Sequence, residues 1–594
     1  MWKLDQFNYN RRPSDTIQIG KLLLGGNQSV RVQSMANTDT NDIENSVAQC
    51  LRIVEAGGEM VRFTTQGVRE AENIGKIHAA LREQGCNVPL VADIHFNANA
   101  ADVAARNVEK VRINPGNYVG SIKIGDTSDY TDEEFALEYQ KIRARFIPFL
   151  NICKENNTAI RIGVNHGSLS ERMMNRYGDT SRGMVESCME FLRICNEENF
   201  HNVVISMKTS NTVMMVQTVR LLVDEMEREN LHFPLHLGVT EAGDGEDGRI
   251  KSAVGIGGLL ADGIGDTIRV SLSEEPEAEI PVGRLLVSYV SERTKQQPII
   301  ATEHILHSRF EYSRRRTDAV GNIGGDNVPV VIAPANGSFE TVPDFILSNG
   351  KVLSNTGELF SIYSAETIDE LQKDTDEIKF LKLKYSDLTP KLLGLLNEKR
   401  DIVVLLYTQH ANGVGEQRAF FHTLLNAGCT VPVILCRNYV ENELQYLQIK
   451  AAADLGVLFI DGFGDGILLE NNGSISVEAI NSVAFGILQA SRVRVTKTEF
   501  ISCPGCGRTM FNLQHVIARV KSRTSHLKGL KIGIMGCIVN GPGEMADADY
   551  GYVGAGRGKV SLYKKKECLE RNISEDDAVN KLIELIKVNG DWHE

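Results

Sequence analysis

Residues 259–272, LLADGIGDTIRVSL, hold the unit from which most of this chain is built. An apolar segment ends at Gly263 and Gly265, and a short run rich in β-branched residues, DTIRVSL, follows them. Side chains of a strand alternate between two faces, so Arg269 and Ser271 share one face near the end of this run. A strand that starts apolar and ends polar is typical of a parallel sheet whose functional groups gather at one edge.

Seven more runs of this kind precede it, and longer segments of helical period, such as 42–56 and 97–107, separate them. The runs, with the number of the first residue of each, are SVRVQSM (29), EMVRFTTQ (59), PLVADIHF (89), KVRINPGN (110), AIRIGVNHG (159), NVVISMKTS (202) and PLHLGVTEAG (234). Eight strands in about 250 residues suit a closed (β/α)₈ barrel better than an open sheet. The sequence therefore predicts an α/β protein with a TIM barrel over residues 1–297.

Residues 298–491 repeat the α/β character, with strand-like runs VPVVIAP (328), DIVVLLYT (401), TVPVILC (430) and LGVLFIDG (455). Within them, residues 458–471, LFIDGFGDGILLEN, echo residues 259–272. Duplication and chance similarity of Gly-rich loops both explain the echo. Leu468 and Glu470 replace the Arg and Ser of the first copy, and a carboxylate would repel an anion. We therefore expect a degenerate α/β barrel-like insert that acts as a spacer without an active site.

The composition is that of an ordinary globular chain. Its 594 residues suffice for roughly two to four domains. With 42% hydrophobic and 24% charged residues, it has no apolar run long enough to cross a bilayer. A net charge of −13 argues against a nucleic-acid binder. The N-terminal segment lacks the features of a secretory signal or transit peptide, so we expect a cytoplasmic protein whose eleven cysteines are thiols or metal ligands.

Cationic side chains end five of the eight predicted barrel strands, namely Arg62, Arg112, Arg161, Lys208 and Arg269. In a TIM barrel these ends meet at one mouth, and the polar Asn114, Asn165 and Ser271 end the same strands. Guanidinium groups match phosphate oxygens with paired hydrogen bonds, so we favour a pocket for a doubly phosphorylated small molecule. The alternative is a ring of structural salt bridges to Asp93, Glu241 and Asp266.

His95 and Glu241 are the candidates for proton transfer beside that anion. His95 follows Asp93 by two residues and shares its strand face, which favours a catalytic pair. A histidine in such a position can equally be a satisfied structural residue, and the sequence leaves both interpretations open.

Residues 492–594 carry three thiols, in FISCPGCGR (500–508) and GCIVNGPGE (536–544). Cys503 and Cys506 form a CxxC pair, and Cys537 is the third thiol. Zinc, a redox pair and an iron–sulfur cluster are each compatible with this spacing. No fourth Cys or His stands at zinc-finger spacing, which favours an iron–sulfur cluster in a small α+β domain.

The fourth ligand of such a centre is open on spacing alone. His515, His526 and Cys568 are possible, but none of them lies in a turn shaped by Gly and Pro. Glu544 does, at the end of NGPGE, and glycines let the backbone wrap closely around a ligand, so we favour it. An oxygen ligand would hold one iron weakly, so that the site could bind substrate oxygen as well as pass electrons.

The motifs taken together resemble one family. VRFTTQ, ADIHF, VRINPGN, IRIGVNHGSLSERM, SMKTS, GVTEAG, GIGDTIRVSL, CPGCGR and GCIVNGPGE occur in this order. The set closely resembles the 4-hydroxy-3-methylbut-2-enyl diphosphate synthases, which act at the penultimate step of the non-mevalonate isoprenoid pathway. The resemblance covers the first and third regions, and the middle region looks like the central insert of the three-domain form of that family.

The resemblance implies reductive ring opening and dehydration of 2-C-methyl-D-erythritol 2,4-cyclodiphosphate, with two electrons from flavodoxin or ferredoxin. It implies a 4Fe-4S cluster held by Cys503, Cys506, Cys537 and Glu544, and an active-site acid at Glu241. The substrate-binding positions of the family correspond here to Arg62, Arg112, Asn114, Arg161, Asn165, Lys208, Arg269 and Ser271. His95 and Asp93 stay candidate catalytic residues beside them.

In two-domain members of the resembled family, the cluster domain closes on the barrel of a partner chain. We therefore expect a homodimer with cross-chain closure, although an insert of this size could let one chain close on itself. Two rival functions stay open: a phosphate-binding barrel enzyme with a structural zinc, such as a relative of the pterin synthases, and a metal-cluster sensor of a diphosphate metabolite. We expect no nucleic-acid or membrane partner.

Overall fold

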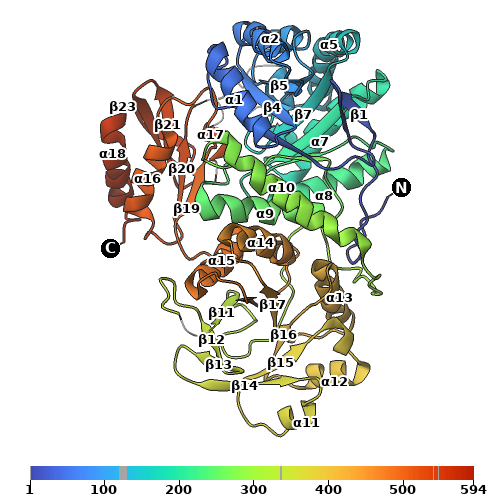
Figure 1. The fold of residues 1–594 in the computed structure, drawn as a ribbon, viewed down its shortest axis with the longest axis vertical. Coiled ribbons are helices and arrows are strands. Elements are labelled where there is room, and N and C mark those ends of the chain that lie inside the picture. Colours follow the sequence, from blue (N-terminus) through green and yellow to red (C-terminus); the bar gives the residue numbers. More distant parts are fainter. Residues whose placement is uncertain (1, 120–129, 335–336, 539–540, 546, 594) are drawn as a thin grey trace.

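The computed structural model describes residues 2–119, 130–334, 337–538, 541–545 and 547–593. They form a first barrel, a second barrel from the middle of the chain, and a smaller C-terminal domain (Figure 1). The second barrel lies below the first in this view, and the C-terminal domain lies beside the first. Within the described part of the chain, no helix is both long and apolar enough to cross a membrane.

The first barrel is a parallel sheet of eight strands. They are β3 (Arg31–Met35), β4 (Met60–Thr65), β5 (Leu90–Ile94), β6 (Lys110–Ile113), β7 (Ala159–Asn165), β8 (Val203–Lys208), β9 (His236–Leu237) and β10 (Thr267–Ile268). Each strand lies next to its neighbours in the chain, and β10 returns to pair with β3. A parallel bridge between Ile205 and Leu235 joins β8 to the start of β9 and closes the ring. The predicted TIM barrel is therefore confirmed.

Helices cover the outside of this barrel, and a short hairpin covers its N-terminal end. The helices are α1 (Ile43–Glu55), α2 (Val68–Glu83), α3 (Ala98–Ala104), α4 (Pro115–Tyr118), α5 (Asp132–Asn156), α6 (Glu171–Tyr177), α7 (Ser181–Glu197), α8 (Thr212–Arg228), α9 (Gly245–Ala261) and α10 (Glu279–Ser291). The hairpin consists of β1 (Ile17–Ile19) and β2 (Leu22–Leu24), whose buried side chains pack against Met60, Val91 and Val204. The C-terminal ends of the strands are thus left for a binding site.

The middle region forms a second closed barrel, as the sequence predicts. Its strands are β11 (Val330–Pro334), β12 (Phe345–Ser348), β13 (Lys351–Ser354), β14 (Leu359–Ser364), β15 (Lys379–Leu383), β16 (Ile402–Leu406), β17 (Val433–Tyr439) and β18 (Gly466–Asn471). Its helices are α11 (Ile368–Leu371), α12 (Pro390–Glu398), α13 (Gly413–Asn426), α14 (Leu444–Ile460) and α15 (Val477–Ala490). β13 is antiparallel to both of its neighbours, and apolar side chains such as Phe380, Leu405 and Leu468 pack together as a core. Because of its antiparallel strand, this barrel departs from the all-parallel (β/α)₈ pattern, as expected of a degenerate barrel.

One strand predicted for this region is wrong. Residues 455–460 of LGVLFIDG form the last turns of α14, and the strand follows as β18. A short apolar run is compatible with a buried strand or with a buried helix. The second half of α14 is buried on all sides, so this segment lacks the polar face that marks a surface helix.

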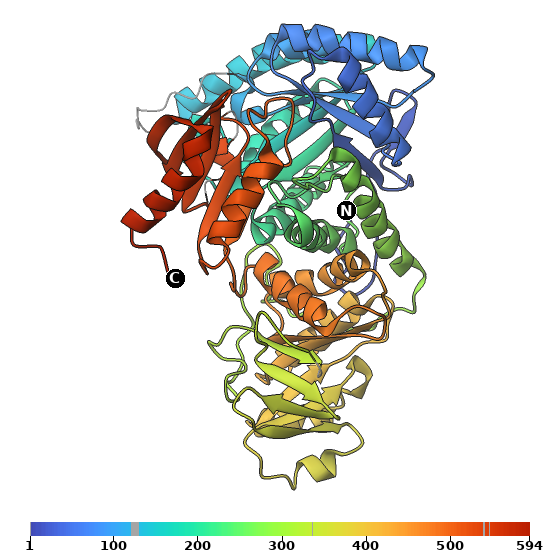
Figure 2. The same ribbon diagram turned by 60° about the vertical axis from the view of Figure 1, so that its left-hand side comes forward.

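Glycines let the two barrels approach closely where α9 packs against α14. A Cβ atom at Gly257 would lie 2.8 Å from the Cβ of Ala453, and one at Gly456 would lie 2.5 Å from Cγ2 of Val254. Glycine inside a helix costs about 0.5–1 kcal/mol relative to alanine, so the close contact rather than helix propensity accounts for these residues. Figure 2 shows the insert extending from this contact as a separate lobe.

A ring of four buried charges joins the two barrels beside that contact. Arg220 of α8 lies 2.8 Å from Asp262 and 2.7 Å from Asp461. Arg418 of α13 pairs with the same two aspartates, at 2.8 Å each. Asp262 and Asp461 occupy matching positions of the two echoed segments, so each barrel contributes one arginine and one aspartate.

A second repeat supports duplication over chance similarity. Residues 9–15, YNRRPSD, and residues 312–318, YSRRRTD, precede the two barrels. The first arginine of the earlier segment pairs with Asp266 at 3.1 Å, and that of the later segment pairs with Asp465 at 3.2 Å. Asp266 and Asp465 also occupy equivalent positions of the echoed segments 259–272 and 458–471. Each barrel therefore has the same ion pair between an N-terminal arginine and an aspartate far along the chain.

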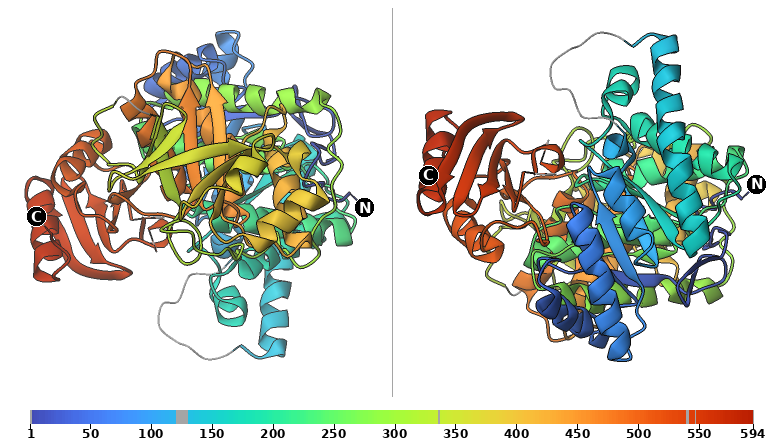
Figure 3. Two further views of the ribbon diagram at one scale, coloured as in Figure 1. Left: turned by 90° about the horizontal axis from the view of Figure 1, so that it is seen from below. Right: turned by 90° about the horizontal axis from the view of Figure 1, so that it is seen from above.

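The C-terminal domain is an α+β unit built on one five-stranded sheet. Its strands are β19 (Glu499–Ser502), β20 (Lys531–Met535), β21 (Tyr550–Gly556), β22 (Lys559–Lys564) and β23 (Glu567–Ser574). Its helices are α16 (Leu513–Thr524), α17 (Gly541–Glu544) and α18 (Glu575–Val588). β19, β20 and β21 are parallel, so the loops after them emerge at one edge. Figure 3 shows this domain, in red, at one side of the first barrel in both views.

Candidate active site

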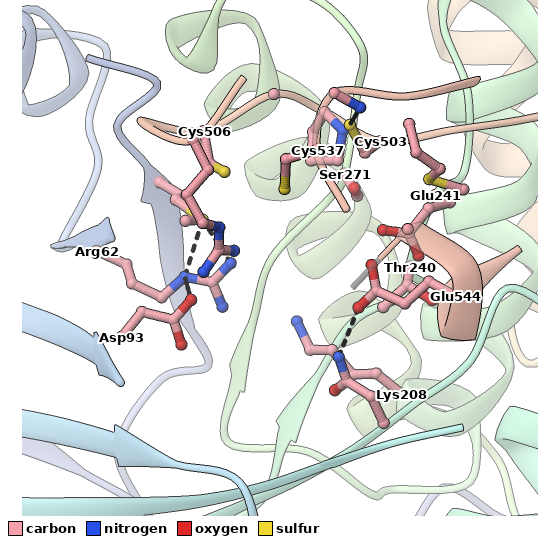
Figure 4. Close-up of a pocket in the computed structure, with 18 of the residues that line it drawn as sticks. Arg62, Asp93, Lys208, Thr240, Glu241, Ser271, Cys503, Cys506, Cys537 and Glu544 are labelled. Carbon is pink, nitrogen blue, oxygen red and sulfur yellow. Dashed lines mark hydrogen bonds and ion pairs between the residues drawn. The ribbon is translucent and has the colours of Figure 1, made fainter. Parts of the chain in front are cut away.

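The strand ends of the first barrel and the loops after β19 and β20 line one cavity. All the predicted site residues except Asn114 line it: Arg62, Asp93, His95, Arg112, Arg161, Asn165, Lys208, Glu241, Arg269, Ser271, Cys503, Cys506, Cys537 and Glu544. Figure 4 shows the three thiols along the upper edge, with Arg62 and Asp93 at one side and Lys208 below. The space between them, with the open solvent at its mouth, is about 750 Å³.

Asp93 organises one side of the cavity. Its Oδ1 accepts a hydrogen bond from Arg112 at 3.2 Å, and its Oδ2 lies 3.8 Å from Nε of Arg62. Arg112 also donates to the backbone oxygen of Gly163 at 2.8 Å. Burial raises the pKa of Asp93, but Arg62, His95 and Arg112 outweigh it and hold the pKa well below the ordinary value. Asp93 is therefore a fixed negative charge that orients the side chains around it.

His95 is buried beside this carboxylate and is neutral. Its Nε2 lies 3.1 Å from Oδ2 of Asp93, and its Nδ1 has no partner among the described residues. Burial, followed by the positive charge of Arg508, lowers the pKa of His95 to about 3. A neutral ring that donates Nε2–H to Asp93 keeps Nδ1 as an acceptor, as a proton-transfer residue requires.

Two of the five cations have no acidic partner among the residues that the structure describes. Arg161 is 1% exposed and Lys208 is 6% exposed, and neither forms an ion pair with a described carboxylate. Nε and Nη1 of Arg161 have no hydrogen-bond partner there. Burial lowers the pKa of both side chains, and neighbouring cations, Arg62 foremost for Arg161 and Arg161 for Lys208, lower it further. Unpaired cations held away from water are suited to an anionic ligand.

The alternative of a ring of structural salt bridges holds only in part. Arg269 is committed to Glu279, with bonds of 2.8 and 3.0 Å, and Arg112 is committed to Asp93. Asp266, another acidic candidate for such a ring, instead pairs with Arg11 at the N-terminal end of β10. Among the described residues, Arg161 and Lys208 form no ion pair with any of the three acidic residues of the predicted ring.

Glu241 holds a strained position between the barrel and the C-terminal domain. Its φ of 47° lies in the left-handed region, which a non-glycine residue adopts at a cost of about 1–3 kcal/mol. The following residue, Ala242, forms a parallel bridge with Ser502 of β19. Oε2 of Glu241 is buried without a partner among the described residues. Burial, followed by the nearby Glu544, raises the pKa of Glu241 well above its ordinary value.

The three cysteines come from two adjacent loops at the edge of the C-terminal sheet. Cys503 and Cys506 follow β19 and Cys537 follows β20, and all three are half-buried. The N–H of Gly536 donates to Sγ of Cys503 at 3.3 Å. Among the described residues, no group of three or more His, Cys, Asp or Glu side chains could hold a single metal ion. Three thiols on one cavity, with a backbone N–H donating to one sulfur, form a donor set that fits an iron–sulfur cluster.

The C-terminal domain closes on the barrel of its own chain. Nδ2 of Asn165 donates to Oε1 of Glu544 at 2.7 Å, and Oγ of Ser273 donates to the backbone oxygen of Cys503 at 2.9 Å. A Cβ at Gly167 would lie 2.3 Å from the backbone oxygen of Gly543, so only glycine permits this approach. The expected cross-chain closure is therefore wrong for this structure. The insert packs on the α9 side of the first barrel through α14 and α15, and the chain then continues into the C-terminal domain beside its own mouth (Figure 1).

Asn114 does not line the cavity. Its Oδ1 caps α4 by accepting from the N–H of Gly116 at 3.1 Å, and its Nδ2 donates to Ser168 at 3.2 Å. Asn is a preferred N-cap residue, and here the side chain of Asn114 caps α4, the short helix that follows β6. Asn114 therefore shapes the loop beside the mouth rather than facing the cavity.

The other candidates for a fourth ligand also lie elsewhere. His515 is exposed in the first turn of α16, and the ring of His526 packs edge-on against Trp592. Cys568 lies on β23, where its thiol contacts the backbone oxygen of Glu570. None of these three lines the cavity, whereas Glu544 does.

Sequence reasoning missed several side chains that line the cavity, among them Arg508, Met35 and Thr240. Arg508 ends the quoted CPGCGR motif, and its position two residues after Cys506 was the available signal. Met35 contacts a cation of the barrel, with its Sδ 2.6 Å from Nη2 of Arg62. Thr240 directly precedes Glu241. An apolar Met and an uncharged Thr carry no sequence signal for such a site.

The fold and this cavity define a barrel enzyme whose pocket is completed by a thiol-bearing domain. The family description GcpE TIM-barrel domain matches residues 14–284, and GcpE protein C-terminal domain matches residues 499–588. The chain belongs to the GcpE family.

Curated relatives carry the name 4-hydroxy-3-methylbut-2-en-1-yl diphosphate synthase (flavodoxin). The relative from Parabacteroides distasonis is 59% identical, with 99% of each chain covered. The one from Phocaeicola vulgatus is 58% identical, with 100% of each chain covered. Among solved structures, the Yersinia pestis dihydropteroate synthase matches 46% of this chain and 98% of its own at 10% identity and a TM-score of 0.30, which is too low to bear on function.

Proposed function

We propose that this cavity is where the chain carries out the reaction of its family. The reaction opens the ring of 2-C-methyl-D-erythritol 2,4-cyclodiphosphate and removes one hydroxyl as water, giving 4-hydroxy-3-methylbut-2-enyl diphosphate. Two electrons and a proton enter, and one C–O bond to phosphate and one C–O bond to hydroxyl break. The cavity must therefore hold a diphosphate, receive electrons and supply a proton.

The barrel residues hold the diphosphate. Arg161 and Lys208 are the cations without a described acidic partner, so an anion would satisfy them most directly. The other proposed substrate-binding residues of the cavity are Arg62, Arg112, Asn165, Arg269 and Ser271. Ser271 adds a hydroxyl donor, and Asn114 supports the neighbouring loop from outside the cavity. Because the donors are already buried, little water has to be reorganised when the ligand binds.

The C-terminal domain holds a 4Fe-4S cluster through Cys503, Cys506, Cys537 and Glu544. When bound, this group supplies the two electrons, one at a time. Glu241 gives the proton to the leaving hydroxyl; its strained backbone and an Oε2 without a described partner in the same cavity support this role. His95 and Asp93 position the ligand from the opposite side, with Nδ1 of His95 as an acceptor for a substrate hydroxyl.

The three regions then have separate tasks. Residues 1–297 bind the substrate, residues 298–491 act as a spacer without a site of their own, and residues 492–594 carry the cluster. Flavodoxin, which is part of the relatives' name, or ferredoxin supplies the electrons. The chain works in the reducing cytoplasm, where its eleven cysteines are thiols or metal ligands rather than disulfides. A homodimer, which the family resemblance implied, is not needed to complete the cavity.

The observation that carries the proposal is that three thiols and two unpaired buried cations line the same cavity. The test is turnover of the cyclic diphosphate by anaerobically purified chain with dithionite as electron source. We expect formation of the linear allylic diphosphate in wild type and none in Cys503→Ala or Arg161→Ala. A wild-type chain with intact cluster that leaves the cyclic diphosphate unchanged would contradict the proposal.

A further inference from the structure

Arg508 is a cation that the C-terminal domain places in the cavity. It follows the CPGCG loop, is 6% exposed, and lines the cavity with the cations of the barrel. Its Nε and Nη1 are buried without hydrogen-bond partners among the described residues. Leaving buried charged donors unpaired costs several kcal/mol in general, so this guanidinium is held ready for a group that is not protein.

The preceding glycine explains why the side chain enters the barrel mouth. A Cβ at Gly507 would lie 2.5 Å from the backbone oxygen of Thr38 and 3.3 Å from Cα of Asp39. Backbone therefore packs on backbone between the CPGC loop and the loop after β3. This contact fixes the chain one residue before Arg508 and leaves the side chain little freedom to turn away.

The nearest charges on the barrel do not neutralise Arg508. Asp93 attracts it, but Asp93 already accepts bonds from Arg112 and His95 and lies near Arg62. Arg62 and Arg508 also repel one another across the cavity. Closure of the domain thus adds a sixth cation to the five of the barrel mouth, and an anion bound between them would relieve their mutual repulsion.

We propose that Arg508 binds a phosphate of the diphosphate ligand from the cluster-domain side, so that the ligand bridges the two domains. The proposal rests on the proposed function and adds a residue to it. The barrel cations hold the ligand from below, and Arg508 reaches it only when the C-terminal domain is closed. Ligand binding and domain closure are therefore coupled, and water is excluded once the phosphate is bound.

A structural role for Arg508 is the competing explanation, because Cys506, Cys537 and Glu544 also attract its charge. The two roles differ in when they act. If Arg508 only supports the loop, replacing it alters the loop whether or not ligand is bound. If Arg508 binds phosphate, replacing it alters the loop only when the ligand is present.

The test compares wild type with Arg508→Gln and Arg508→Ala in anaerobically purified full-length chain of matched iron content. Arg523→Ala is the control, because Arg523 is exposed on the same domain and bonds only to Asn580 among the described residues. Calorimetry without reductant measures binding of the cyclic diphosphate. We expect a loss of about tenfold or more for both Arg508 variants and no change for the control. Equal affinity of wild type and Arg508→Gln overturns the proposal.

Hydrogen exchange separates binding from support. Ligand should slow exchange in residues 36–42 and 503–511 of wild type, and this slowing should be lost in Arg508→Gln while exchange without ligand stays unchanged. Faster exchange of residues 503–511 without ligand would assign Arg508 a structural role instead. If wild type binds no cyclic diphosphate, the proposed function fails. If wild type binds it and the Arg508 variants bind it equally well, only the inference about Arg508 fails.

Discussion

Asn165 at the end of β7 donates from Nδ2 to Oε1 of Glu544 in α17, at 2.7 Å. The bond joins the substrate-binding barrel to the proposed cluster ligand of the same chain. Asn165 also lies 3.4 Å from Nη2 of Arg112 through its Oδ1. One amide thus contacts both halves of the proposed site, which makes it a sensitive probe of their coupling.

Replacing Asn165 by Ala should weaken closure of the C-terminal domain. A hydrogen bond to a charged group contributes about 1.5–3 kcal/mol, so kcat/KM for the cyclic diphosphate should fall by roughly ten- to hundredfold. Iron and sulfide content should stay at the wild-type value. Steady-state kinetics with dithionite, alongside iron analysis, check this, and unchanged kcat/KM would show that the bond does not matter for turnover.

Arg161 and Arg269 should respond in opposite ways to replacement by Met. Arg161 is buried without a described acidic partner, so Arg161→Met should raise the melting temperature while ligand affinity falls by on the order of 1.5–3 kcal/mol. Arg269 is paired with Glu279, so Arg269→Met leaves a buried carboxylate and should cost about 3–5 kcal/mol of stability.

Thermal unfolding and calorimetry on the two variants give the comparison. The contrast is informative because both side chains are large, buried and on neighbouring parts of one cavity. Destabilisation by Arg161→Met equal to that by Arg269→Met would mean that Arg161 is a structural cation after all.

The charge ring between the barrels predicts a pH effect. Burial raises the pKa of Asp461, but Arg220 and Arg418 outweigh it and leave the pKa below the ordinary value of 3.8. A carboxylate with a lowered pKa stabilises the fold at every pH above its ordinary value, and this contribution is lost as pH falls through the folded pKa. Asp461→Asn should therefore cost about 3–5 kcal/mol at neutral pH.

The difference between wild type and Asp461→Asn should be constant from neutral pH to about pH 5 and shrink only below the ordinary aspartate pKa. Denaturant unfolding at several pH values measures it. A difference that is already small at neutral pH would show that the ring does not hold the barrels together.

Ligand choice for the cluster can be tested by substitution. Anaerobic protein should contain about four iron and four sulfide per chain, and both should be lost in air. Cys503→Ala, Cys506→Ala and Cys537→Ala should not retain the cluster, whereas Cys568→Ala and His515→Ala should, because these two side chains lie outside the cavity. One zinc and no sulfide in wild type would contradict the assignment.

The barrel and its mouth could be predicted because each strand carries its own signal. β-branched residues mark the strands, and period-two alternation places Arg62, Asp93, Arg112 and Arg269 at their ends, so no long-range information was needed. The closed parallel sheet then brings these side chains together at one mouth. The spacing of apolar residues could not distinguish a strand from a buried helix at residues 455–460. This part of α14 is buried on all sides, so it has no polar, solvent-facing side that would mark a helix.

The remaining errors come from a local helix cap in one case and from contacts between distant segments in the others. Asn114 was expected in the cavity, but a local helix cap competes for its side chain. Arg508 was missed because its place depends on Gly507 packing against Thr38, some 470 residues earlier in the sequence. Closure within one chain could not be read from the sequence either, since it follows from how the insert packs on α9.

The central claim is that one chain supplies both halves of the site, and complementation tests it most directly. Arg112→Ala removes the barrel half and Cys503→Ala removes the cluster half, so the two inactive chains are mixed anaerobically, refolded together and assayed for turnover of the cyclic diphosphate. Because Asn165 and Glu544 meet within one chain, we predict no more activity in the mixture than in the two variants alone. Recovery of a substantial fraction of wild-type turnover, with mixed dimers detected by differently tagged chains, would show that the site is shared between chains and would contradict the account.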